Sequence, residues 1–213
     1  MRLKMTKVII GMVFILLIGA LTSDYDTAYS SRANMRAINS HSLVIGEDFF
    51  QDGAVFGRTL GDLGERLQIV NTLESVFGIK TPIHLGINSL GGLLGLYDAL
   101  DEYGQGLLQA HVVCTISAAA SMAFTFIIKY CDERIMLPEA VVMTHRAYIP
   151  LWFSKLFTDA TERATLKYSD EEAAILGQDP DFWYKLTREN GDKEFTVEEM
   201  KKYKIATGFV KGK

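Results

Sequence analysis

Segments with the pattern of β-strands alternate with segments that have the pattern of α-helices from Ser42 onward. Short apolar runs predict strands at residues 42–46, 82–88, 110–116, 134–138 and 140–145. Helical periodicity predicts helices at residues 60–78, 92–104, 157–176 and 179–190, and another after the strand that ends at Ile116. Strands that alternate with helices of this length are typical of a mostly parallel sheet with helical crossovers. The sequence therefore predicts a single-domain α/β fold.

The predicted helix at residues 60–78 has a clear apolar stripe that should face the core. Its members recur at helical spacing: Leu63, Leu67, Val70, Leu73 and Phe77. The full chain of 213 residues, 48% of them hydrophobic, is long enough to bury one such core. We find no repeat or linker that would divide the sequence after Ser42.

Charge and histidine content exclude several classes of function. The net charge of −4 and the lack of a Lys/Arg run argue against a nucleic-acid partner. None of the four histidines, His41, His84, His111 and His145, has a second His or Cys at the spacing of zinc ligands. No phosphate-binding loop is present either. We therefore expect no metal and no other cofactor.

Residues 1–23 predict export or membrane attachment. Basic residues in "MRLKMTK" precede an uncharged apolar run at residues 8–23, and aspartates follow it at once. This order is typical of a secretory signal. The run is shorter than the roughly 20 residues that span a bilayer, and Ala20 and Thr22 form only a mediocre cleavage site, so a cleaved signal peptide and a retained signal-anchor both remain open. We expect an N-terminal extension at residues 24–41 and the folded domain at residues 42–213.

Cys114 and Cys131 flank the apolar stretch "TISAAASMAFTFIIKYC". An exported chain could oxidise the pair, but free thiols are also common in such apolar surroundings. We expect two buried free thiols.

Two junctions between a predicted strand and a predicted helix are unusual. In "INSLGG", the Gly91-Gly92 pair would let backbone N–H groups approach a ligand, or would simply make a tight turn. In "SAAASM", Ser121 is expected in the first turn of a helix, where the N–H of Met122 has no helical acceptor. The alternative for Ser121 is a helix serine that bonds back to a carbonyl.

Together the two junctions and a third motif resemble a known family. "INSLGG", "AAASMA" and "LPEAVVMTH" occur in the order of the motifs of the Clp protease proteolytic subunit, a serine peptidase with the ClpP/crotonase fold. The resemblance covers roughly residues 42–209. It implies Ser121 as nucleophile, His145 as general base, and the backbone N–H groups of Gly91 and Met122 as the oxyanion hole. It also implies a homo-oligomer that cuts peptides or unfolded segments.

The third member of the implied triad comes from "GDKEFTVEEMKKYKIATG", which resembles the family's segment with Asp192 in place of its aspartate. Asp181, in "QDPDFW", is the fallback. The chain departs from the family's pattern at Leu90, Ser117 and Ala123, and none of these changes removes a reacting group. A serine needs a neighbouring imidazole to take its proton, and the imidazole needs a carboxylate that holds its tautomer and stabilises its charged form.

Two other readings remain open. Membrane-attached signal peptide peptidases share this fold but use a Ser-Lys dyad, for which this chain offers Lys155, Lys167 and Lys185. "VVMTH" favours histidine, and we expect Lys155 and Lys167 to face solvent. The chain could also be a catalytically silent scaffold of the same fold that assembles or binds a membrane partner. The export signal places it outside the cytoplasm, anchored or free, away from an ATP-driven unfoldase.

Overall fold

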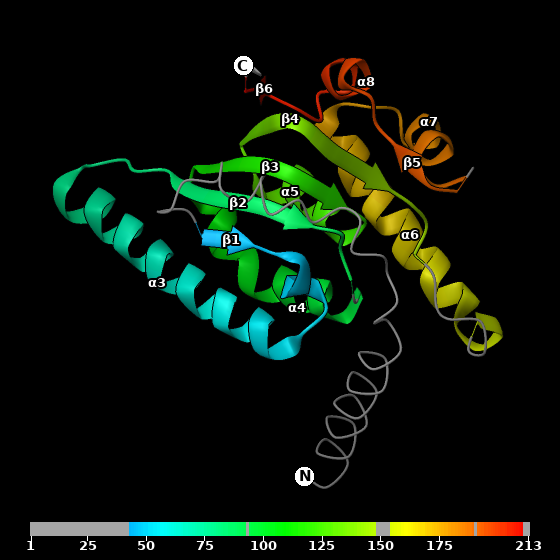
Figure 1. Cartoon of the computed structure of the whole chain (residues 1–213). Coiled ribbons are helices and arrows are strands. Elements are labelled where there is room, and N and C mark those ends of the chain that lie inside the picture. Colours follow the sequence, from blue (N-terminus) through cyan, green and yellow to red (C-terminus); the bar gives the residue numbers. More distant parts are fainter. Residues whose placement is uncertain (1–42, 93, 148–153, 190, 211–213) are drawn as a thin grey trace, which may run out of the picture. The chain divides into compact units, whose positions relative to one another are not determined.

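A mostly parallel sheet forms the centre of the domain. The computed structural model describes residues 43–92, 94–147, 154–189 and 191–210. The strands are β1 (Leu43–Ile45), β2 (Ile83–Ser89), β3 (Val112–Ala120), β4 (Glu133–Thr144), β5 (Lys193–Glu194) and β6 (Gly208–Phe209). Strands β1 to β4 pair in chain order and in parallel, and their arrows point the same way in Figure 1. β5 is antiparallel to β4, and β6 is parallel to it.

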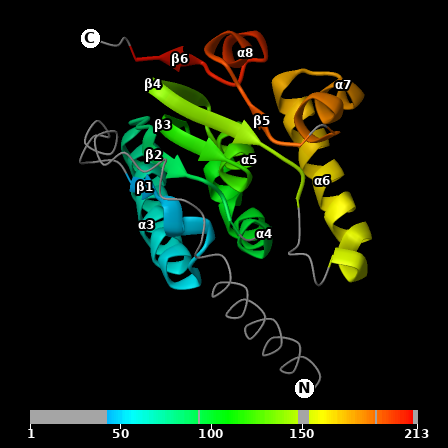
Figure 2. The same cartoon turned by 45° about the vertical axis from the view of Figure 1, so that its right-hand side comes forward.

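Helices connect the parallel strands, which confirms the predicted α/β fold with helical crossovers. The helical elements are η2 (Glu47–Phe50), α3 (Gly53–Phe77), α4 (Leu94–Tyr103), η3 (Gly104–Gln109), α5 (Met122–Tyr130), α6 (Ser154–Leu176), α7 (Pro180–Tyr184), η4 (Lys185–Glu189) and α8 (Val197–Lys202). α5 packs on β3 and β4 and also contacts α6 (Figure 2). The two motif-bearing junctions therefore lie at the carboxyl ends of neighbouring parallel strands, where ligands collect in such sheets.

α3 is longer than predicted. The side chain of Asp52 caps its start by accepting hydrogen bonds from the N–H groups of Ala54 and Val55, at 2.7 and 3.1 Å. Of the predicted stripe, Leu63 is buried, but Phe77 is 66% exposed. The prediction for Phe77 is wrong because the last turns of α3 extend beyond the sheet (Figure 1).

One long strand, β4, replaces the two short strands predicted at residues 134–138 and 140–145. The register with β3 shifts between the pairs Ile116–Met136 and Ala118–Val141, and Glu139 has φ 62°. The extra residues form a bulge that contains Pro138, whose missing N–H would interrupt a regular ladder. The strand resumes after the bulge and continues to Thr144.

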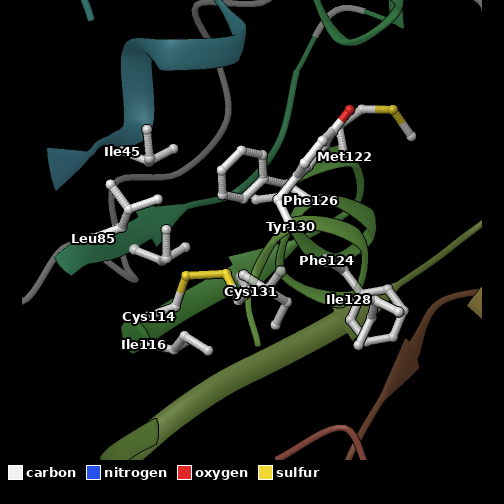
Figure 3. Close-up of a cluster of buried hydrophobic side chains, with 14 of the residues drawn as sticks. Ile45, Leu85, Cys114, Ile116, Met122, Phe124, Phe126, Ile128, Tyr130 and Cys131 are labelled. Carbon is white, nitrogen blue, oxygen red and sulfur yellow. A yellow bond between two sulfur atoms is a disulfide. The ribbon is translucent and has the colours of Figure 1, made fainter. Parts of the chain in front are cut away.

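α5 closes the core over the sheet, and a disulfide fixes it there. Figure 3 shows apolar side chains on both sides of α5: Phe126 faces the side where Leu85 of β2 lies, and Phe124 lies on the other side near Ile128. Cys114 of β3 and Cys131 after α5 form a disulfide with a Cα–Cα distance of 5.8 Å, which lies in the usual range. The expectation of free thiols is therefore wrong. The chain reverses at Ser121, so that residues 17 apart in the sequence meet.

The predicted signal segment, residues 1–23, and the extension at residues 24–41 lie outside the described residues. Among the helices of the part that is described, none has both the length and the apolar content needed to cross a bilayer.

Candidate active site

Ser121 lies at the tight junction between β3 and α5. It is the N-cap residue of α5, one position before the first turn in which we predicted it, with φ 51° and ψ −117°. Its own N–H donates to the carbonyl of Met143 in β4 at 3.1 Å, and its side chain does not cap the helix. A serine with positive φ is strained, and such strain clusters at functional sites. The junction directs the hydroxyl away from the helix.

His145 directly follows β4 and meets Ser121. The Oγ of Ser121 is hydrogen-bonded to Nε2 of His145. The other ring nitrogen, Nδ1, lies 2.5 Å from the carbonyl oxygen of Arg146. A carbonyl only accepts, so Nδ1 carries the proton in this contact and Nε2 is left to accept from the serine hydroxyl. This tautomer is the one in which an imidazole can act as a base.

Gly91 packs against the backbone around Ser121. It has φ 86°, and a Cβ at this position would lie 2.7 Å from the Ala120 carbonyl oxygen and 2.9 Å from the Met122 nitrogen. The N–H of Gly91 makes a long contact, 3.3 Å, with the hydroxyl of Ser89. The N–H of Met122 is in the first turn of α5, where a helix supplies no acceptor. The two N–H groups predicted as the oxyanion hole therefore lie on adjoining backbone segments.

The small side chains before Ser121 allow this close approach. In the sheet register, Ala118 and Ala119 lie opposite Asn88 and Ser89 of β2. All three alanines, at residues 118–120, are buried, and bulkier side chains would compete for the space at this junction.

Asp192 directly precedes β5, and His145 directly follows β4. β5 pairs with β4 through Met143–Glu194 and Thr144–Lys193, and extending that antiparallel register by one residue would place Asp192 opposite His145. The Asp192 side chain is exposed, and the partners described for the His145 ring are Ser121 and Arg146. The fallback, Asp181, is exposed in the first turn of α7.

The candidate lysines differ in how far the structure describes them. Lys167 is half-exposed, and its Nζ lies 3.4 Å from Oδ2 of Asp101. Lys185 is exposed at the start of η4. Neither has the apolar surroundings that a lysine base needs to lose its proton. The side chain of Lys155 lies outside the described part.

Ser117, the rival serine, is occupied elsewhere. Its buried hydroxyl lies 3.2 Å from the carbonyl oxygen of Ile87 and 3.0 Å from Oδ1 of Asn88. It therefore connects β3 to β2 and does not face His145.

A buried ion pair beside the site was not predicted. Glu172 and Arg188 are 1% and 2% exposed, and the Arg188 Nη2 lies 2.8 Å from the Glu172 Oε1. Both residues occur in strongly charged segments, which usually face solvent, so the sequence held no signal of their burial.

Comparison with known proteins finds likeness among solved structures. No protein-family model and no curated protein matches the chain. Among solved structures, a point mutant of ClpP1 from Listeria monocytogenes superposes with a TM-score of 0.61 and 20% sequence identity, over 84% of this chain and 96% of that chain. A likeness at this identity bears on the fold alone, and the fold of this chain is ClpP-like.

Proposed function

We propose that this chain is a serine peptidase that hydrolyses peptide bonds. In the proposed mechanism Ser121 is the nucleophile, His145 the general base and Asp192 its orienting carboxylate. The N–H groups of Gly91 and Met122 stabilise the oxyanion. The ClpP-like fold supports a peptidase, and the residues of the linked sequence motifs supply the named roles.

The hydrogen bond between Ser121 Oγ and His145 Nε2 carries the proposal. As the serine oxygen attacks the scissile carbonyl, its proton moves to Nε2, and the imidazolium later returns a proton to the leaving amine. The carbonyl oxygen becomes an oxyanion, which backbone N–H donors stabilise by about 3 kcal/mol each. Met122 follows the nucleophile and Gly91 packs against it, so both donors adjoin Ser121.

Asp192 orients His145 in the proposed catalytic state. The Arg146 carbonyl, 2.5 Å from Nδ1, holds the imidazole in this structure, and Asp192 directly precedes the strand that pairs with the end of β4. In the proposed state the carboxylate displaces that carbonyl, because a carboxylate stabilises the imidazolium better than a neutral oxygen does. Hydrogen bonds at a catalytic site commonly tighten only when substrate binds.

Labelling with a fluorophosphonate tests the nucleophile. The wild-type protein should be labelled at Ser121, as located by mass spectrometry of the modified peptide, and Ser121→Ala should abolish labelling. Ser75→Ala is a matched control, because Ser75 is an exposed serine of α3 that bonds only to its own helix, 3.3 Å from the Thr72 carbonyl oxygen. Labelling that survives Ser121→Ala would refute the assignment, and a wild type that takes no label would favour the silent scaffold.

Hydrolysis of a short fluorogenic peptide distinguishes the two candidate bases. His145→Gln should lower kcat/KM by several orders of magnitude, because loss of a triad member disables the whole unit. Asp192→Asn should lower kcat/KM by no more than His145→Gln does. Lys155→Ala and Lys167→Ala should each retain most activity. If a lysine variant is silent while His145→Gln remains active, the enzyme is of the Ser-Lys type.

We also propose that the protein works outside the cytoplasm, on peptide or unfolded substrates, as a homo-oligomer. The signal-like sequence at residues 1–23 supports export, and so does the disulfide, because disulfides persist mainly in oxidising compartments. Sedimentation of the purified protein tests the oligomer, and a monomer at working concentration would contradict it.

A further inference from the structure

A fully buried ion pair lies where the elements of the candidate site meet. Glu172 of α6 and Arg188 of η4 are joined by Nη2 and Oε1 at 2.8 Å. The second carboxylate oxygen, Oε2, accepts from the indole N–H of Trp183 in α7 at 3.0 Å. Figure 2 shows α6 and α7 beside the end of β4.

On one side the pair is bonded to the helix that begins at Ser121. The hydroxyl of Thr125 in α5 donates to the same Oε1 of Glu172 at 2.8 Å. Thr125 follows the nucleophile by one turn, and its N–H donates to the carbonyl of Ser121 at 3.3 Å. Glu172 therefore restrains the first turn of α5.

On the other side the pair is bonded to the strand that ends before His145. The Nη1 of Arg188 donates to the hydroxyl of Thr144, which is completely buried at the end of β4. The chain of contacts thus runs from Thr125 through Glu172 and Arg188 to Thr144. It connects the backbone that carries the nucleophile with the backbone that carries the base.

The same pair also holds the chain segment that leads to Asp192. Arg188 belongs to the short segment between α7 and β5, and β5 follows Asp192 directly. Beyond β5, Phe195 stacks on Phe124 of α5 and on Trp183, with ring centroids 5.4 and 5.9 Å apart. Polar and aromatic contacts therefore hold the ends of this segment to α5.

Such a pair is a poor way to add stability alone. Removing two charges from water costs about as much as their attraction returns, and apolar residues of similar volume often do as well. What an ion pair with directional hydrogen bonds adds is a defined geometry, because the guanidinium fork bonds two acceptors at fixed angles. Here those two acceptors are Glu172 and Thr144, on different elements.

We propose that Glu172 and Arg188 are positioning residues that set the distance between Ser121 and His145; this inference rests on the proposed peptidase function. Neither residue touches the reacting atoms. They act through Thr125, which lies one helical turn after Ser121, and through Thr144, which directly precedes His145. A displacement of about 1 Å between reacting groups can lower a rate by about 100-fold.

Thr144→Val tests the inference while leaving the ion pair in place. Valine has nearly the shape of threonine and favours strands, so the variant should fold. It lacks the hydroxyl that accepts from Arg188. We expect kcat on a fluorogenic peptide, and the rate of fluorophosphonate labelling at Ser121, to fall about 10- to 100-fold with KM nearly unchanged. Thr144→Ser, which restores the hydroxyl, should recover most of the lost rate.

Two further variants separate positioning from stability. Thr59→Val removes the hydroxyl of a buried threonine in α3 and should leave kcat unchanged. Arg188→Lys keeps the charge, but its single nitrogen on a different side chain cannot reproduce the fixed fork geometry by which Arg188 bonds Glu172 and Thr144. It should therefore lower kcat more than the change in its melting temperature would explain. Thermal unfolding of each variant measures that change.

The outcomes are distinguishable. If wild type is labelled at Ser121 but Thr144→Val is labelled equally fast, the positioning role is wrong and the peptidase stands. If Thr144→Ser is as slow as Thr144→Val, the hydroxyl is not what matters, and the role is also wrong. A wild type that neither takes label nor cleaves peptide overturns the proposed function and this inference with it.

Discussion

At the scale of single residues, the site depends on backbone conformations that few side chains tolerate. Ser121 has φ 51°. Gly91 has φ 86°, and a Cβ at this position would lie only 2.7 Å from the Ala120 carbonyl oxygen. Two hydrogen bonds of the Ser121 backbone maintain its strained conformation. Its N–H donates to the carbonyl of Met143, and its carbonyl accepts from the N–H of Thr125. Strain of this kind persists only where the surrounding structure over-determines it.

Under the proposed function, Gly91→Ala should therefore abolish peptide hydrolysis without unfolding the protein. The new Cβ would meet the Ala120 carbonyl at 2.7 Å, so the Gly91 segment must move away from Ser121. Displacing one oxyanion donor costs about 100- to 1000-fold in kcat. Hydrolysis of a fluorogenic peptide measures the loss, and circular dichroism checks the fold.

Gly64→Ala is the matched control for that change. Gly64 is exposed in α3, and a Cβ there would meet nothing within 4 Å. Alanine should stabilise the helix by about 1 kcal/mol and leave kcat unchanged. Equal activity of Gly91→Ala and wild type would remove Gly91 from the oxyanion hole.

The sequence predicts the identity of these residues better than their geometry. Linked motifs single out Gly91, Ser121 and His145, because the proposed chemistry restricts their residue types and the motifs occur in a recognisable order. The hydrogen bond from His145 to the Arg146 carbonyl carries no sequence signal, because any residue supplies a carbonyl. That Asp192 directly precedes a strand paired with the end of β4 became known only from the pairing of β4 with β5.

At the scale of elements, β3, Ser121 and α5 form one closed unit. The chain leaves the sheet at Ser121 and returns through α5 to Cys131, where the disulfide joins it to Cys114. The N–H of Asp132 then donates to the carbonyl of Val112 at 2.9 Å. The strained junction thus lies at the tip of a loop whose base is covalently closed.

Removing both cysteines should lower the free energy of unfolding by about 3 kcal/mol, the value for a crosslink that closes a loop of about 15 residues. The double variant Cys114→Ala with Cys131→Ala, unfolded in urea, measures this difference. A reducing agent should destabilise the wild type and leave the double variant unchanged. If a reductant present throughout unfolding and refolding, when the buried bond becomes exposed, alters the unfolding curve of neither protein, the two cysteines are not joined.

Strand and helix identities follow from periodicity, whereas their limits depend on tertiary contacts. Pro138 breaks the apolar pattern of β4 and predicts two strands, but pairing with β3 on both sides of the bulge joins them. Phe77 continues an apolar stripe that the sheet is too short to cover. The disulfide escaped prediction because the reversal at Ser121, which brings the cysteines together, is itself a tertiary feature.

At the scale of the whole molecule, the disulfide and the N-terminal segment bear on the same question of location. The sequence at residues 1–23 has the order of a secretory signal, and the residues proposed for the site all lie in the described part of the chain. Cys114 is fully buried and Cys131 is 3% exposed, so an existing bond is shielded from reagents in the folded protein. Where the chain folds should therefore decide whether the bond forms.

Deleting residues 1–23 should change the compartment and the redox state of the protein together. Full-length protein should be recovered with the membrane or outside the cytoplasm, and its cysteines should resist a maleimide after denaturation without reductant. The deletion variant should remain in the reducing cytoplasm with both thiols reactive. Oxidised after purification, it should cleave the fluorogenic peptide like wild type, because Ser121, His145 and Asp192 all lie in the folded domain.

An alkaline carbonate wash separates a retained anchor, which stays in the membrane pellet, from a cleaved signal. Full-length protein found soluble in the cytoplasm with two free thiols would refute export, whatever its activity.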